Sequence, residues 1–249
     1  MRLFLHELRN QQRLFWRNRE LAFFTFMLPL ILYVMLASVN RESEYAGIGG
    51  PDYLLAGMIG YSAAAIGFGA LAMTLVYRRE DGTLKRLRAT PLPARTYVAG
   101  ILASIFVSFA ITTAILYALG VAMFDASLPA RPLSLVAAIA IGAAAFSALG
   151  LAAAALVRSD SAAVAVLNGL YLPMTFLSGS FFPREAFPEF LQRASEVLPL
   201  TYYIDIVRGV LFDDRAIWAD PAGLAVIAAW GAVGAAVALR SFSWVPRSR

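Results

Sequence analysis

The side chains best suited to chemistry in this 249-residue chain lie in one short charged segment between long apolar runs. Residues 78–95 hold six basic side chains, and only Glu80 and Asp81 oppose them. Basic groups pair with carboxylates or with anionic lipid, so the indicated chemistry is recognition of an acidic partner or of a membrane surface. The alternative interpretation is a plain cytoplasmic loop, whose basic residues reflect only the excess of Lys and Arg on the cytoplasmic side of membrane proteins. The six are Arg78, Arg79, Lys85, Arg86, Arg88 and Arg95.

The residues that catalysis requires are scarce. The chain has no cysteine, and its single histidine, His6, lies in a segment predicted to be a surface helix. The sequence offers no nucleophile with a base, no set of metal ligands and no Gly-rich phosphate loop of the Walker type. No predicted span carries a charge well inside the bilayer, which argues against a proton- or sodium-driven carrier. We therefore expect a protein that is not an enzyme and holds no cofactor or metal of its own.

The composition indicates a membrane protein, because 60% of the residues are hydrophobic and 15% are charged, against about 25% charged in soluble domains. Residues 1–20 carry five arginines and an apolar helical stripe, which predicts an amphipathic helix in the membrane interface. A cleaved signal peptide is the less favoured alternative. The expected fold is an all-α polytopic membrane protein, with residues 1–249 as a single domain of six transmembrane helices. The predicted spans are residues 21–39, 53–77, 97–124, 133–156, 161–181 and 219–239.

Two stretches near the C-terminus depart from plain spans. The fifth predicted span is interrupted at Asn168 and Pro173, and Ser178 and Gly179 break it again near its end. Broken backbone at membrane depth is tolerated inside protein or beside a water-filled space, so we expect this span to line a pathway. A proline kink in a packed helix is the open alternative. Residues 183–212 predict two short helices, a re-entrant hairpin that lies in or dips into the outer leaflet.

Charge orients these elements. Six spans place both termini on one side, together with residues 78–95 and the turn at 157–160. That side carries 15 of the 21 Lys and Arg residues. By the positive-inside rule we expect both termini and the 78–95 segment in the cytoplasm, and residues 183–212 outside the cell. The net charge of +5 is then a property of cytoplasmic loops and gives no reason to expect nucleic acid as a partner.

The charged segment itself predicts a short helix. Gly82 permits a turn, and Thr83 is placed to cap a helix over residues 84–89 that ends before two prolines. Leu84 and Leu87 are three residues apart and share one helical face, which we expect to fill a groove on a partner protein.

This segment resembles the cytoplasmic coupling segment of type-2 ABC (ATP-binding cassette) exporter permeases. The family pattern is roughly Arg-Glu-x-Gly-Thr-Leu-x-x-Leu-x-x-Thr-Pro-Leu, and residues 80–92 read Glu-Asp-Gly-Thr-Leu-Lys-Arg-Leu-Arg-Ala-Thr-Pro-Leu. A second match reads Leu-Ser-Gly-Ser-Phe-Phe-Pro at 177–183, and Leu-Pro-Leu-Thr-Tyr follows at 198–202. Together with the N-terminal helix and the six spans, the resemblance covers the whole chain.

The resemblance implies a permease that dimerises with itself or with a paralogue above two ABC ATPase subunits, which would bind the ATP and Mg. It implies export of a drug-like or lipid-like substrate, as in daunorubicin-resistance-type exporters. Polysaccharide or glycoconjugate export, a non-transporting membrane scaffold and a gradient-driven carrier are the alternatives. The implied coupling residues are Glu80, Gly82, Thr83, Leu84, Arg86, Leu87, Thr90 and Pro91, and the implied pathway and external residues add Phe182, Pro183, Pro199 and Tyr202 to those of the fifth span.

Overall fold

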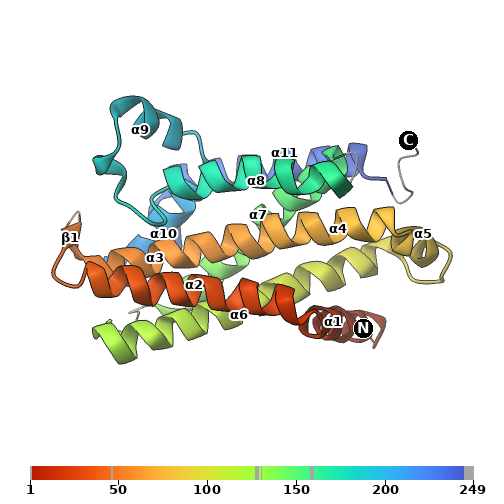
Figure 1. Cartoon of the computed structure of the whole chain (residues 1–249), viewed down its shortest axis with the longest axis horizontal. Helices are drawn as coiled ribbons and strands as arrows, with labels where there is room; N and C mark the ends of the chain where they lie inside the picture. Colours follow the sequence, from red (N-terminus) through yellow and green to blue (C-terminus); the bar gives the residue numbers. More distant parts are fainter. Residues whose placement is uncertain (1, 46, 127–128, 130, 158–159, 244–249) are drawn as a thin grey trace.

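Long apolar stretches of the chain fold into helices, because a helix satisfies every backbone N–H and C=O group within one segment, as lipid requires. The computed structural model describes residues 2–45, 47–126, 129, 131–157 and 160–243 (Figure 1). Within those residues, five helical stretches are long and apolar enough to cross a membrane. They are Ala22–Val39, Gly50–Glu80, Ala94–Phe124, Pro132–Leu156 and Pro221–Ser241. The all-helical membrane fold is thus confirmed, with about five long apolar helices.

The helices follow one another through short connections, and the strands β1 and β2 pair as an antiparallel hairpin between α2 and α3. The bounds are α1 Arg2–Arg17, α2 Arg19–Val39, β1 Glu44–Tyr45, β2 Ile48–Gly49, α3 Gly50–Ala63, η1 Ala64–Ala70, α4 Leu71–Glu80, α5 Thr83–Arg88, α6 Ala94–Phe124, α7 Pro132–Leu156, α8 Asp160–Leu177, η2 Arg184–Ala186, α9 Glu189–Ser195, α10 Pro199–Phe212, η3 Ile217–Ala219 and α11 Pro221–Ser241.

The fifth predicted span corresponds to α8. Its apolar stretch, Ala162–Leu177, is shorter than the five long helices. At 1.5 Å per residue it reaches about 24 Å, less than the ~30 Å of a bilayer core. The helix ends before the predicted boundary at residue 181 because the chain turns at Gly179, whose φ is 80°. A crossing by α8, and with it the total of six, stays a prediction.

The bundle has two dissimilar ends (Figure 1). α1 and α5 lie together at one end, and the β1–β2 hairpin and α9 lie at the opposite one. We call these the α5 end and the hairpin end. The N-terminal helix and the charged segment therefore share an end, as the sequence predicts; which end faces the cytoplasm stays a prediction. The predicted turn at 157–160 lies partly outside the described residues, at 158–159, as does the C-terminal segment 240–249, at 244–249.

Glycines set the spacing between helices inside the bundle. A Cβ on Gly67 would stand 2.9 Å from the Phe146 side chain of α7, and a Cβ on Gly60 would collide with Ile204 of α10. The small residues of the Gly50–Glu80 helical stretch therefore let neighbouring helices approach it closely. Between α3 and α4 the helix takes the wider π form, η1, and α7 packs directly against it.

The two short helices predicted after the fifth span have different surroundings. α9 is amphipathic and lies on the surface, with Phe190 exposed. α10 packs against α3, α7 and α11, and most of its residues are buried. The two predicted short helices are therefore present, and α10 is buried in the bundle; the position of the hairpin relative to the outer leaflet stays a prediction. The apolar side chains of α10 occupy nearly every helical face, which favours burial within the bundle over a surface position.

The N-terminal helix α1 packs on α6 with a partly polar inner face. Glu7 and Gln11 are its buried residues, whereas Leu3, Leu5 and Trp16 are more than half exposed. The predicted helix is confirmed. Leu3, Leu5 and Trp16 point away from the protein, where a membrane interface would cover them, whereas Phe4, Leu8 and Phe15 are partly buried.

Candidate functional site

The charged segment forms a helix–turn–helix at the α5 end of the bundle. α4 ends at Glu80, and Gly82 adopts φ 74°, a left-handed conformation that favours glycine. Asp81 Oδ1 accepts a hydrogen bond from the backbone N–H of Thr83, with 2.8 Å between the heavy atoms. The turn at Gly82 is confirmed. The cap predicted for Thr83 is wrong, because Thr83 is already the first residue of α5 and Asp81 supplies the side-chain acceptor.

α5 turns its leucines inward and its cations outward. Leu84 is fully buried in the core of the chain, and Leu87 is partly buried against that core. The prediction that these two side chains fill a groove on a partner is therefore wrong for Leu84, since burial against the helix's own bundle already removes its apolar surface from solvent. The exposed side chains of α5 are Lys85, Arg86 and Arg88.

The remaining predicted coupling residues shape the two ends of α5. Glu80 pairs with Arg79 at 2.9 Å. After the helix, the Thr90 hydroxyl donates to the carbonyl oxygen of Leu87 at 2.7 Å, and the exposed Pro91 follows. The first contact lies at the end of α4 and the second closes the end of α5, which packs against α4.

Arg79 was predicted from the sequence to be one of the exposed cations of the charged segment, but in the structure it is buried and joins two helices. Its side chain is 2% exposed, and its guanidinium donates to the carbonyl oxygens of Ala154 at 3.0 Å and Val157 at 2.8 Å. These carbonyls belong to the C-terminal end of α7, where a helix leaves its last C=O groups without internal partners. Arg79 therefore joins α4 to α7, and its pairing with Glu80 balances the buried charge.

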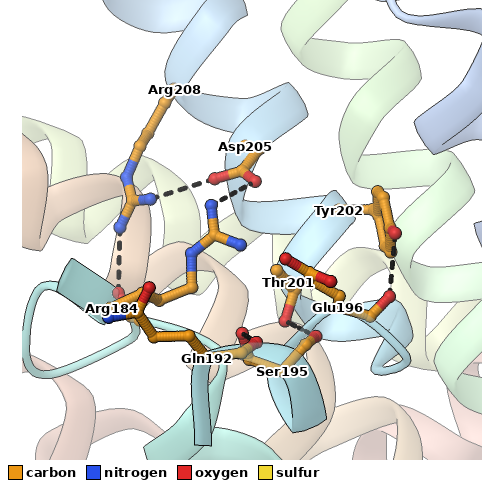
Figure 2. Close-up of polar contacts among 9 residues, drawn as sticks. Arg184, Gln192, Ser195, Glu196, Thr201, Tyr202, Asp205 and Arg208 are labelled. Carbon is orange, nitrogen blue, oxygen red and sulfur yellow. Dashed lines mark hydrogen bonds and ion pairs between the residues drawn. The ribbon is translucent and has the colours of Figure 1, made fainter. Parts of the chain in front are cut away.

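A charged cluster holds the hairpin end together (Figure 2). Asp205 of α10 accepts from Arg184 at 2.9 Å and from Arg208 at 3.1 Å. Arg208 also donates to the carbonyl oxygen of Gly179 at 2.9 Å, and its guanidinium lies 3.7 Å from the ring centre of Tyr53. The cluster thus fastens the segment after α8 to both α10 and α3.

The electrostatics of this cluster follow from its burial. Burial raises the pKa of the Asp205 carboxyl, and the guanidiniums of Arg184 and Arg208 oppose that rise. Burial lowers the pKa of Arg208, against the influence of Tyr53 and Asp205. An acid held between two guanidiniums and a stacked ring has the arrangement of a structural clamp, since the carboxylate oxygens already accept hydrogen bonds.

The pathway residues predicted on the fifth span do not come together. Asn168 and Pro173 are exposed on α8, whereas Ser178 and Ser180 are fully buried. Within the described part of the chain, neither serine hydroxyl has a hydrogen-bond partner. A Cβ on Gly57 of α3 would overlap the Ser180 backbone, so this turn is packed tightly against α3. If these positions lined an open pathway, cysteines placed at Ser178 and Ser180 would react with a thiol reagent. The burial of both positions argues against that reaction.

The other predicted external residues connect α9 to α10. Pro199 is buried in the first turn of α10, and the Tyr202 hydroxyl donates to the carbonyl oxygen of Glu196 at 2.8 Å (Figure 2). Phe182 is exposed, and Pro183 is partly buried beside the turn at Gly179.

The paired acid and base of α10 could have been found in the sequence. Asp205 and Arg208 are three residues apart, a spacing that brings side chains together on a helix, in a stretch that is otherwise mostly apolar. Arg184 and the burial of Arg79 had no comparable pattern, because their partners lie far away in sequence.

Comparison with known proteins agrees with this architecture. The family described as "ABC-2 type transporter" matches residues 2–212. Nodulation protein J of Neorhizobium galegae is 31% identical over 182 residues, which cover 71% of this chain and 65% of that protein, just under two thirds of its length. Nodulation protein J of Rhizobium leguminosarum bv. trifolii is 31% identical over 206 residues, 79% of this chain and 76% of that protein. The protein named "Putative transport permease YvfS" of Bacillus subtilis (strain 168) is 23% identical over 198 residues, 78% of this chain and 80% of that protein.

The family match runs from the start of α1 to the end of α10. It takes in four of the five long apolar stretches, both charged ends of the bundle and the whole of α5. The chain therefore belongs to the ABC-2 type transporter family, as a multi-pass membrane permease with a transport role rather than a catalytic one.

Proposed function

We propose that this chain is the permease subunit of an ATP-driven exporter that moves a hydrophobic or amphipathic substrate, drug-like or lipid-like, outward across the cell membrane. The observation that carries the proposal is the way in which α5 packs on the bundle. Its cations are exposed, while Leu84 and the neighbouring Arg79 are buried in the bundle. A force on such a helix passes directly into α4 and α7. The relationship to a protein named as a transport permease supports transport as the outcome.

The proposed complex has two ABC ATPase subunits, which carry ATP and Mg, and a second permease that is a copy or a paralogue. The ATPases meet the α5 end, where acidic side chains on their surface pair with Lys85, Arg86 and Arg88. Both termini and α5 are cytoplasmic in this arrangement, and the hairpin end is external. The excess of Lys and Arg in the segments assigned to the cytoplasm, 15 of 21, supports that orientation.

The test is co-purification with the ATPase, together with ATP-dependent uptake of daunorubicin by inside-out vesicles. A variant with Lys85→Gln, Arg86→Gln and Arg88→Gln keeps the fold, since all three side chains are exposed, and is expected to lose both co-purification and uptake. Arg193→Gln removes an exposed arginine from another short helix, α9, at the hairpin end, and is the matched control. Undiminished co-purification of the triple variant would refute docking through α5. Co-purification without uptake of any amphipathic probe would favour a scaffold.

A further inference from the structure

A cavity of about 400 Å³ lies near the α5 end, between α1, the η1–α4 helix and α6. One part of its wall is apolar and includes Phe15, Ile66, Ile101 and Ile105. The other part is polar and includes Gln11, Arg78 and Ser104. Volumes of about 300–1,000 Å³ with apolar walls and a few convergent polar groups are typical of small-molecule sites. The cavity is separate from the charged cluster at the hairpin end and from the outer face of α5.

Arg78 is the cation of this cavity, and its hydrogen bonds go to neutral groups. It donates to Gln11 Oε1 at 2.9 Å and to the Tyr97 hydroxyl at 3.0 Å. Among the described residues, no carboxylate lies within 4.0 Å of its guanidinium, although Arg79, Arg184 and Arg208 each have one. Partly buried guanidiniums are normally paired with an anion.

The neighbouring acids are already engaged. Gln11 stands between Arg78 and Glu7, because its amide group donates to Glu7 while its oxygen accepts from Arg78. Asp81 also lines the cavity, but it is exposed at the mouth, and Oδ1 accepts from the N–H of Thr83. The charge of Arg78 therefore stays available to an anion that enters from outside the chain.

We propose that this cavity binds a membrane amphipath, with its phosphate or carboxylate headgroup on Arg78 and its alkyl chain along Ile66, Ile101 and Ile105. α1 forms the roof, held down by Gln12, which donates to the carbonyl oxygen of Ser104 at 2.9 Å. The exposed apolar side chains of α1 place this roof at the level of lipid headgroups. A resident acidic phospholipid and the exported molecule are two sources of the same chemistry, and only the second rests on the proposed function.

The site can be tested on the permease alone, in nanodiscs of neutral phosphatidylcholine. The probe is hexadecyl phosphate with a photoreactive diazirine in its chain, and mass spectrometry locates the labelled residues. The label is expected on η1 and on α6 between residues 101 and 108. Arg78→Gln should reduce probe affinity about tenfold or more, the effect of losing a charge-assisted hydrogen bond. Arg95→Gln removes an exposed arginine from α6 outside the cavity and should leave affinity unchanged.

Two further variants keep the proposal falsifiable if Arg78→Gln loosens α1. Ala70→Leu fills the cavity without touching Arg78 and should also lower affinity. Asp81→Asn removes a negative charge from the mouth while keeping an acceptor for Thr83, and should raise affinity a few-fold. Equal losses for Arg78→Gln and Arg95→Gln, or labelling that Ala70→Leu does not reduce, would overturn the site.

Competition then identifies the source. Displacement of the probe by phosphatidylglycerol upholds the site and assigns it to a resident lipid. Release of the bound probe on addition of the ATPase with ATP upholds the site and assigns it to the exported molecule. Failure of phosphatidylglycerol and of unlabelled hexadecyl phosphate to compete would refute it, whatever the transport assay shows.

Discussion

Arg79 Nη2 lies 2.8 Å from the carbonyl oxygen of Val157, so that the end of α4 is fastened to the end of α7. The guanidinium donates hydrogen bonds to two carbonyl oxygens at the end of α7 at once, and no side chain with a single donor group can replace both bonds. α5 begins four residues after Arg79, at Thr83 and beyond the Gly82 turn. The position of the exposed cations therefore depends on a bond between residues 78 positions apart.

Arg79→Met is expected to lower the free energy of unfolding by about 1.5–3 kcal/mol, because two buried carbonyl groups lose hydrogen bonds from a charged donor. Thermal unfolding of the purified permease in detergent measures the change. Arg95→Met, which removes an exposed arginine at the same end, is the control and should stay within about 0.5 kcal/mol. Equal stability of the two variants would mean that the contact with α7 does not hold α4.

Leu84→Ala is expected to destabilise the permease by about 2–5 kcal/mol, since it leaves a cavity at a fully buried site. The neighbouring Lys85→Ala change removes an exposed side chain from the same helix and should have little effect on unfolding. Both variants are compared by thermal unfolding without any ATPase present. A Leu84→Ala protein that unfolds at the same temperature as the unsubstituted protein would place Leu84 on a partner-facing surface instead.

Asp205→Asn is expected to cost about 3–5 kcal/mol, because it leaves the buried Arg208 without a counter-charge. Asp214→Asn is the matched change at an exposed ion pair, with Arg131, and should cost about 0.2–1 kcal/mol. Limited proteolysis after residue 177 gives a second measurement, since the cluster holds this segment to α10. Protection that is the same in both variants would contradict the role of the cluster.

Gly57→Ala is expected to destabilise the bundle by about 1–3 kcal/mol, because the added methyl group meets the Ser180 backbone rather than a movable side chain. Gly169→Ala is the control on a neighbouring helix, where a Cβ finds open space. That change should be neutral or should stabilise α8 by up to about 1 kcal/mol, since alanine favours helix. Unfolding temperatures that fall in the reverse order would show that α3 and the Ser180 turn are not in contact.

The sequence was sufficient for the features that depend on local composition. Hydropathy located the long helices to within a few residues, and the positive φ of Gly82 follows from glycine between two helical segments. The inward direction of Leu84 was not predictable in this way. A spacing of three residues shows which side chains share a face, but it does not say whether that face meets the chain's own bundle or another protein.

The same limit applies to α10 and to Arg79. Prolines and short length marked residues 183–212 as unlike a span, but burial of α10 arises from contacts with α3, α7 and α11, all distant in sequence. Charge counting treated Arg79 as one more surface cation. Its burial depends on where α7 ends, and the residues next to Arg79 in the sequence give no information about the end of α7.

The π-helical turn η1 gives the second long helical stretch the geometry of a lever. α4 extends ten residues beyond it, about 15 Å, and carries α5 at its tip. A tilt of about 10° at η1 would move α5 by roughly 3 Å, and the Arg79 bond would pull the end of α7 in the same direction. Ile66 and Ala70 of η1 line the cavity beside Arg78. A molecule bound in the cavity would therefore change how easily the helix bends at η1.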